Sequence, residues 1–170
     1  MTLSLYQASV PVFVTMLTNL SNVLSKAEEH AKAKKIDESV FMNARLAPDM
    51  LALPRQIQIA SDAAKGFTAR VGGVPVPSFE DNENSFAELQ ARIRKTIDFI
   101  QTVKPEQIDG GEDRDVSLKL GGQEKTLKGQ SYLLGMALPN LFFHVTTAYG
   151  ILRHNGVQIG KMDYLGGYPQ

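Results

Sequence analysis

Residues 3–31 read LSLYQASVPVFVTMLTNLSNVLSKAEEHA and decide the fold of this chain. Apolar side chains recur there in alternating steps of three and four residues, at Leu3, Tyr6, Val10, Phe13, Leu17, Leu20, Leu24, Ala27 and Ala31. This spacing places all of them on one stripe of a helix. We therefore predict a long amphipathic helix that is kinked at Pro11 and not broken there, because the stripe keeps its phase on both sides of the proline.

Two further stripes of the same period predict two more helices. The first has a start signal at residues 47–49, where Pro48 suits a first helical turn, and its apolar positions extend over residues 53–71. The second begins with a capping box at residues 85–88, in which a serine and a glutamate each satisfy a free amide, and its stripe ends at Val103. Each of these stripes needs another apolar surface to cover it.

The next segment has the pattern of a β-hairpin. Val116, Leu118 and Leu120 alternate with polar residues, a Gly-Gly pair offers a tight turn, and a return strand can follow at residues 126–127. The sequence therefore predicts a small hairpin ahead of the last helix.

The last helical region covers residues 132–152, with Ser131 as its candidate cap and Pro139 inside it. An Asn-Gly pair ends this region, and we expect the tail, residues 157–170, to be irregular and to lie on the surface. Together these elements predict an all-α fold: a four-helix bundle with a small β-hairpin before the last helix, in a single domain over residues 1–170.

Composition excludes several classes of function. The 18 Lys and Arg residues balance 18 Asp and Glu residues, so we expect no nucleic-acid partner and no anionic membrane surface. The absence of cysteine excludes disulfides, thiolate metal sites and cysteine nucleophiles. The start of the chain lacks a basic segment and a cleavage site, and no apolar run approaches 18 residues, so we expect a soluble cytoplasmic protein.

An acidic run, Glu80-Asp81-Asn82-Glu83, precedes the third predicted helix. It lacks the alternate spacing of a dedicated calcium loop. We interpret it as a solvated acidic face that also places negative charge near a helix N-terminus.

Histidine chemistry is restricted to three residues, His30, His144 and His154. His144 lies in the most apolar helix, so we expect it to be at least half buried. One hypothesis is a core histidine that bonds a polar side chain of the second predicted helix, where Gln56, Gln58 and Asp62 are available. The other is a functional imidazole that works with Tyr149 in proton transfer.

The last helix also carries a family resemblance. Its segment His144-Val-Thr-Thr-Ala148-Tyr149-Gly150, followed by Ile-Leu-Arg and Gly156-Val157, resembles the last helix of the DinB/YfiT-like superfamily, whose members usually show His-x-x-x-His-Arg-Gly-Gln there. Within that superfamily the chain is similar to a bacterial family of uncharacterised proteins, a domain of unknown function. The stretches that carry this second likeness are residues 81–89, 139–144, 148–153 and 160–163.

The resemblance implies a DinB/YfiT-like four-helix bundle and, in many relatives, a divalent metal held by three histidines. One of these comes from the second helix, and two stand four residues apart on the fourth. His144 matches the first of that pair, but Ala148 replaces the second, and the second predicted helix contains no histidine. A methyl group cannot replace an imidazole ligand. We therefore expect no cofactor and no tightly bound metal, although oxygen ligands and water could hold a weak divalent ion.

Three hypotheses for function follow. The first is a ligand-binding or non-enzymatic protein with a degenerate metal site and a small-molecule pocket lined by Gln56, Asp62, His144 and Tyr149. The alternative is a metal-dependent transferase or isomerase that acts on a small molecule around His144, since characterised relatives include such enzymes. The third is an interaction module whose only function is to form dimers.

The resemblance also implies a partner, because relatives commonly pair as homodimers. The aromatic tail, with Tyr164 and Tyr168, could cover a neighbouring copy or fold back on its own helices.

Overall fold

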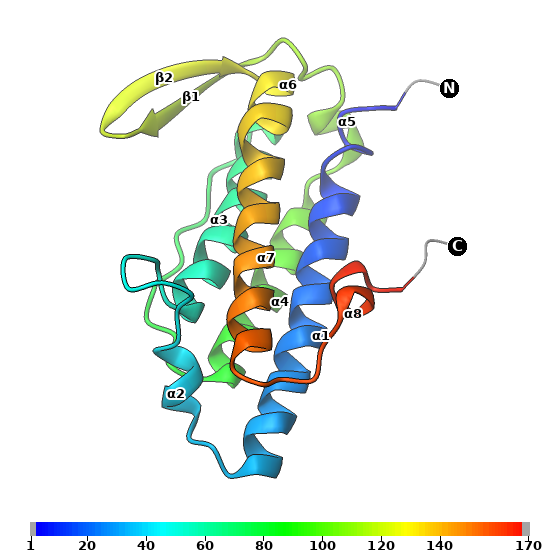
Figure 1. Ribbon diagram of the computed structural model, residues 1–170. Coiled ribbons are helices and arrows are strands. Elements are labelled where there is room, and N and C mark those ends of the chain that lie inside the picture. Colours follow the sequence, from blue (N-terminus) through cyan, green and yellow to red (C-terminus); the bar gives the residue numbers. More distant parts are fainter. Residues whose placement is uncertain (1–2, 168–170) are drawn as a thin grey trace.

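The computed structural model describes residues 3–167 and is mostly helical (Figure 1). Its long helices are α1 (Val10–Lys34), α3 (Leu53–Gly72), α4 (Phe86–Thr102) and α7 (Leu138–His154). The shorter helices are α2 (Glu38–Met42), α5 (Pro105–Ile108), α6 (Gly129–Tyr132) and α8 (Lys161–Leu165), and a π-helical turn, η1 (Leu133–Ala137), joins α6 to α7. The strands are β1 (Asp115–Leu120) and β2 (Gln123–Lys128).

The long helices lie side by side and enclose the core. α3 packs on both α7 and α4, and α1 packs on α4 and α7, so each apolar stripe faces another (Figure 1). Large aromatic side chains fill the centre: Phe13 of α1 meets Phe67 of α3 edge-on, with ring centroids 5.7 Å apart. Neither ring is exposed to solvent. Burial of such aromatic surface is the main source of stability in a core of this kind.

The first helix begins at Val10, and the predicted kink at Pro11 is wrong. Pro11 lies in the first turn, where the missing N–H of a proline costs no helical hydrogen bond. The residues before it form a turn, in which the Ser9 hydroxyl donates to the Leu5 carbonyl at 2.7 Å. Leu5 nevertheless lies in the core. Leu5 is not a member of the predicted stripe, whereas the first member, Leu3, is 71% exposed. The predicted stripe therefore does not extend to Leu3.

The preference of proline for the first helical turn also explains where the next long helix starts. Pro54, and not Pro48, occupies the first turn of α3. Residues 47–50 form a turn closed by a hydrogen bond from the Met50 amide to the Ala47 carbonyl. The prediction that this helix starts at Pro48 is therefore wrong, because two prolines were compatible with a helix start and only the second is followed by unbroken helix.

The predicted capping box of α4 is present in part, because Ser85 caps the helix but Glu88 bonds the backbone amide of Asn84 and not that of Ser85. The Ser85 hydroxyl accepts a hydrogen bond from the Glu88 amide at 3.2 Å, and the Glu88 carboxylate accepts one from the Asn84 amide at 2.6 Å. Two amides that the helix leaves free are thereby satisfied. This start was predicted from sequence.

The predicted hairpin is also confirmed. β1 and β2 pair antiparallel, with Leu118 opposite Lys125, and the turn glycines Gly121 and Gly122 both have positive φ. Val116 and Leu118 are buried, so one face of the hairpin contributes to the core. The hairpin lies at the end of the molecule where α6 begins (Figure 1).

The last helical region differs from its prediction in two respects. Ser131 lies inside α6 and does not cap it. Pro139 lies in the first turn of α7, and the preceding π-helical turn is closed by a bond from the Leu138 amide to the Leu133 carbonyl, five residues back. A π-helical turn lets the chain pass the proline without ending the helical path.

The tail is not irregular, because residues 161–165 form α8, which packs against α1. The side-chain amide of Asn19 donates to the backbone carbonyl of Tyr164 at 3.0 Å, and the Lys26 ammonium pairs with the Asp163 carboxylate at 2.6 Å. The Tyr164 side chain thus folds back on its own chain, whereas Tyr168 lies outside the described residues. Over residues 3–167, no helix combines the length and the apolar character needed to cross a membrane.

Among the glycines of residues 3–167, Gly129 is the one whose added Cβ would come nearest to another backbone atom. A Cβ at this position would overlap the carbonyl oxygen of Gly111, whereas one at Gly135 would meet nothing within 4 Å. We expect Gly129→Ala to lower the free energy of unfolding by about 2 kcal/mol or more, because backbone cannot yield as a flexible side chain can. Gly135→Ala should be neutral or stabilising. Urea unfolding of both variants tests this, and equal stabilities would show that the approach is not tight.

Candidate functional site

The structure brings two of the sequence-predicted site residues together. Gln56 projects from α3 and His144 from α7, with Oε1 of Gln56 2.7 Å from Nδ1 of His144. The Gln56 amide nitrogen donates to the Leu51 carbonyl at 2.8 Å, so the amide oxygen is the atom that faces the imidazole. An oxygen can only accept, and His144 must therefore donate from Nδ1. The sequence hypothesis of a polar partner from the second long helix holds for this pair.

Burial sets the charge state of this imidazole. His144 is only 8% exposed and Gln56 only 1%. Burial lowers the pKa of His144 below its ordinary value of 6.5, and the positive charge of Arg55 lowers it further. A histidine with a lowered pKa is neutral at pH 7. The site therefore presents a neutral ring that carries its proton on Nδ1.

The neighbouring positions do not supply metal ligands. Ala148, one turn after His144, is fully buried and offers only a methyl group. Within residues 3–167, no group of three or more His, Cys, Asp or Glu side chains is close enough to hold one ion. Where the resemblance implies three histidines, this chain has one imidazole, one amide and one methyl group.

The other two predicted pocket residues lie elsewhere. Asp62 is on α3 but faces α4, where it pairs with Lys65 at 2.8 Å and Arg92 at 3.2 Å. Tyr149 is on α7 but packs edge-on against Tyr164 of α8, with ring centroids 6.1 Å apart. The four side chains therefore do not line a common cavity.

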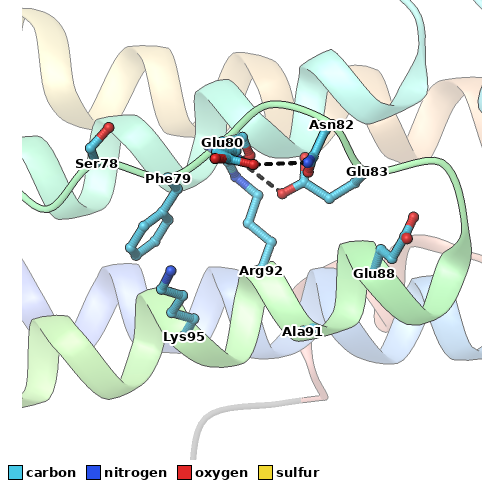
Figure 2. A pocket seen from close by; sticks show the side chains of 9 residues that line it. All are labelled: Ser78, Phe79, Glu80, Asn82, Glu83, Glu88, Ala91, Arg92 and Lys95. Atoms are coloured by element: carbon cyan, nitrogen blue, oxygen red, sulfur yellow. Dashed lines mark hydrogen bonds and ion pairs between the residues drawn. The ribbon is translucent and has the colours of Figure 1, made fainter.

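A polar cluster that sequence reasoning missed is centred on Arg92. This α4 side chain is 2% exposed and crosses to the segment 74–85, which we call the strap (Figure 2). Its guanidinium contacts three carboxylates, those of Asp62 at 3.2 Å, Asp81 at 3.0 Å and Glu83 at 2.9 Å. It also donates to the carbonyl of Glu80 at 3.0 Å. Burial of an arginine is tolerated because the surrounding carboxylates compensate its charge.

Further polar contacts extend this cluster to α3. Arg55 pairs with Asp81 and donates to Gln58 at 2.7 Å. The amide of Gln58 in turn donates to Glu83 at 2.8 Å. Glu80, Asp81 and Asn82 are exposed, as expected of a solvated face. The carboxylates of Asp81 and Glu83 also attach the strap to two helices, which was not predicted. The signal that sequence reasoning lacked was spatial, because nothing in the local sequence pairs Arg92 with residues on the strap.

The cluster holds its acids ionised. Burial by itself would raise the pKa of Glu83, but the hydrogen bonds from Arg92 and Gln58 outweigh it and lower the pKa below the ordinary 4.5. Burial would likewise raise the pKa of Asp81, but Arg55 and Arg92 outweigh it and lower that pKa below the ordinary 3.8. Both carboxylates therefore remain charged at neutral pH.

A hollow of about 470 Å³ lies between the strap and α4 (Figure 2). Its lining includes Phe79 and Glu80 of the strap and Glu88, Arg92 and Lys95 of α4. The Lys95 ammonium lies 4.2 Å from the centre of the Phe79 ring. This hollow is separate from the His144–Gln56 pair, neither member of which lines it.

Comparison with known proteins gives a family and a fold. A family model described as a domain of unknown function, DUF1993, matches residues 5–165. The solved structure of a DinB family member protein from Shewanella denitrificans is similar over 98% of this chain and 94% of that chain, with 41% sequence identity and a TM-score of 0.89. No curated protein matches the sequence.

Acid should weaken the fold through the Arg92 cluster. Carboxylates with lowered pKa values contribute stability above their ordinary pKa values, and this contribution is lost as the pH falls through the lowered values. We expect the free energy of unfolding to fall below about pH 4.5, and to fall less steeply in Glu83→Gln. Glu124→Gln, on the exposed strand β2, is the matched control and should follow the wild type. Urea unfolding of the wild type and both variants across this pH range tests the prediction. Parallel curves of unfolding free energy against pH for all three proteins would show that the Glu83 carboxylate does not contribute through the cluster.

The His144–Gln56 bond should appear in a double-mutant cycle. His144→Leu leaves a buried amide oxygen without a partner, which costs about 1 to 3 kcal/mol of unfolding free energy. Gln56→Leu has the converse effect on the imidazole. The double variant should cost less than the sum of the two, because both ends of the bond are removed together. Additive effects in urea unfolding would show that the two groups do not interact.

Proposed function

The chain belongs to the DUF1993 family of domains of unknown function and is related to a DinB family member, and we propose that it is a small-molecule-binding, non-enzymatic protein with a degenerate metal site. In this proposal it is a single domain with a DinB/YfiT-like four-helix bundle, formed by α1, α3, α4 and α7. Packing of α3 on α7 and α4, and of α1 on the same two helices, supports this arrangement.

The observation that carries the proposal is the bond between Gln56 and His144. Gln56 is the α3 residue that faces His144, so it stands where a ligand from the second long helix would have to stand. Its oxygen satisfies Nδ1, and its nitrogen is held by the Leu51 carbonyl. Ala148 completes the set without a donor atom. One neutral imidazole and one amide oxygen form a poor site for zinc or nickel, which prefer several nitrogen or sulfur ligands.

A second candidate function is a transferase or isomerase that acts around His144. One observation favours it: Nε2 of His144 has no hydrogen-bond partner among residues 3–167, so a neutral imidazole with a free lone pair is available as a base. A carboxylate or amide that orients a metal-bound histidine would have the same geometry as Gln56. The transferase or isomerase function ranks second because Tyr149, the expected proton-transfer partner, packs against Tyr164 instead.

Our proposal also includes a homodimer in the cytoplasm. The apolar side chains of Leu134 and Phe143 are 56% and 57% exposed and supply apolar surface for a partner copy. The charge balance of the chain and its lack of cysteine are compatible with the cytoplasm.

Rebuilding the lost ligands tests the degenerate metal site. We expect wild-type protein, purified without an affinity tag, to bind zinc and nickel no more tightly than micromolar. The double variant Gln56→His with Ala148→His should bind one ion per chain at least a hundredfold more tightly, because it places three imidazoles around one point. Titration calorimetry measures both affinities.

The control is the same double variant carrying His144→Asn, which should lose most of the gain. Nanomolar affinity of the wild type for either metal, at one site per chain, would overturn the proposal. The transferase or isomerase function would then rank first. Failure of the double variant to gain affinity would show that Gln56, His144 and Ala148 do not share one site.

A further inference from the structure

We propose that the hollow between the strap and α4 binds a small amphoteric molecule, an ω-amino acid whose ammonium and carboxylate are separated by an apolar spacer. The inference rests on the proposed ligand-binding function and names its site and ligand class. In this arrangement the ligand carboxylate pairs with Lys95, its ammonium pairs with Glu88, and its spacer lies along the exposed Ala91, which lines the hollow between them.

The walls of the hollow are held rigid before any ligand arrives. Arg92 lines the hollow, is 2% exposed, and ties the strap to α4 through Asp81 and Glu83. Its Nε atom is buried and has no hydrogen-bond partner within the described chain. The Phe79 ring also contacts the ammonium of Lys65, 4.5 Å from the ring centre. A preorganised site loses little conformational entropy on binding, which favours affinity for a small molecule.

One end of the hollow offers an uncompensated positive charge. Lys95 lies over the Phe79 ring and, in the described part of the structure, has no carboxylate within ion-pair distance. The neighbouring cations differ from it, because Lys65 pairs with Asp62 and Arg92 is surrounded by acids. A ligand carboxylate is the partner that Lys95 lacks.

The other end offers negative charge. Glu88 uses one carboxylate oxygen to cap α4, by accepting from the Asn84 amide, and its second oxygen has no partner among residues 3–167. Figure 2 shows Glu88 at the end of the hollow opposite Phe79 and Lys95, with Arg92 between them. A ligand ammonium at Glu88 would meet an acid whose charge no basic side chain compensates.

The spacing of the two ends decides the class of ligand. Lys95 and Glu88 are seven residues apart on one helix, which corresponds to about 10 Å along its axis. The charges of an α-amino acid are too close together to reach both, whereas an ω-amino acid with a ring or a short chain between its charges spans them. A ligand with a single charge would satisfy one end and leave the other without a partner. A hollow of about 470 Å³ accommodates a molecule of this size.

Three matched probes test the proposal: 4-(aminomethyl)benzoate, which carries both charges, 4-methylbenzoate, which carries only the carboxylate, and 4-methylbenzylamine, which carries only the ammonium. Titration calorimetry with the full chain should show one site for the first probe. Its affinity should exceed that of either singly charged probe by at least about fivefold, the ratio expected for one added exposed charge pair.

Charge-removing variants locate the site. Lys95→Met should weaken 4-(aminomethyl)benzoate and 4-methylbenzoate by about five- to tenfold and leave 4-methylbenzylamine unchanged. Glu88→Gln keeps an oxygen for the helix cap and should weaken the two probes that carry an ammonium. Lys119→Met, on the distant hairpin, is the matched control and should bind like the wild type. Circular dichroism confirms that all variants fold.

Equal affinities for the three probes, no binding of any probe, or wild-type affinity in both Lys95→Met and Glu88→Gln would each overturn the inference. None of these results affects the metal titration, so the proposed degenerate metal site stands or falls separately. Nanomolar metal binding by the wild type would overturn the proposed function even if the hollow bound its probe.

Discussion

A buried amide on α3 has to satisfy both of its polar ends, and this requirement links α3 to α7. Gln56 has one end fixed by the Leu51 carbonyl, so its oxygen can only serve His144. A buried donor or acceptor without a partner costs about 1 to 3 kcal/mol, so the pair is stable only when both members are present. The orientation of the imidazole and its tautomer follow from this single bond, whereas burial and the charge of Arg55 lower its pKa and keep it neutral. This bond is sufficient to keep His144 as a structural residue.

The second constraint is the burial of Arg92. An arginine that is 2% exposed has to be surrounded by acids, and the strap supplies two of them, Asp81 and Glu83. The strap is consequently held across α3 and α4, and the hollow next to it has rigid walls. The two polar centres lie on different faces of α3, with His144 on the α7 side and Arg92 on the α4 side. The degenerate metal site that we propose and the site at which we place ligand binding thus lie on different faces of one helix.

Periodicity predicted the parts of the fold that local physics decides. The apolar stripes located the long helices, the Ser85–Glu88 box located the start of α4, and the Gly121-Gly122 turn located the hairpin. Helix starts at prolines were less certain, because Pro48 and Pro54 are equally compatible with a first turn and only tertiary contacts select the second. The helix α8 was missed because its stability comes from Asn19 and Lys26 of α1. At the site, the partner of His144 could be predicted from helix pairing, whereas the Arg92 cluster required knowledge of where the strap lies.

The central claim is that His144 is a neutral, structural histidine, and its tautomer tests that claim most directly. Two-dimensional ¹⁵N NMR of the imidazole at pH 7, assigned by comparison with His144→Asn, reports which ring nitrogen carries the proton. The account predicts a neutral ring protonated on Nδ1. A doubly protonated ring or a proton on Nε2 would contradict it.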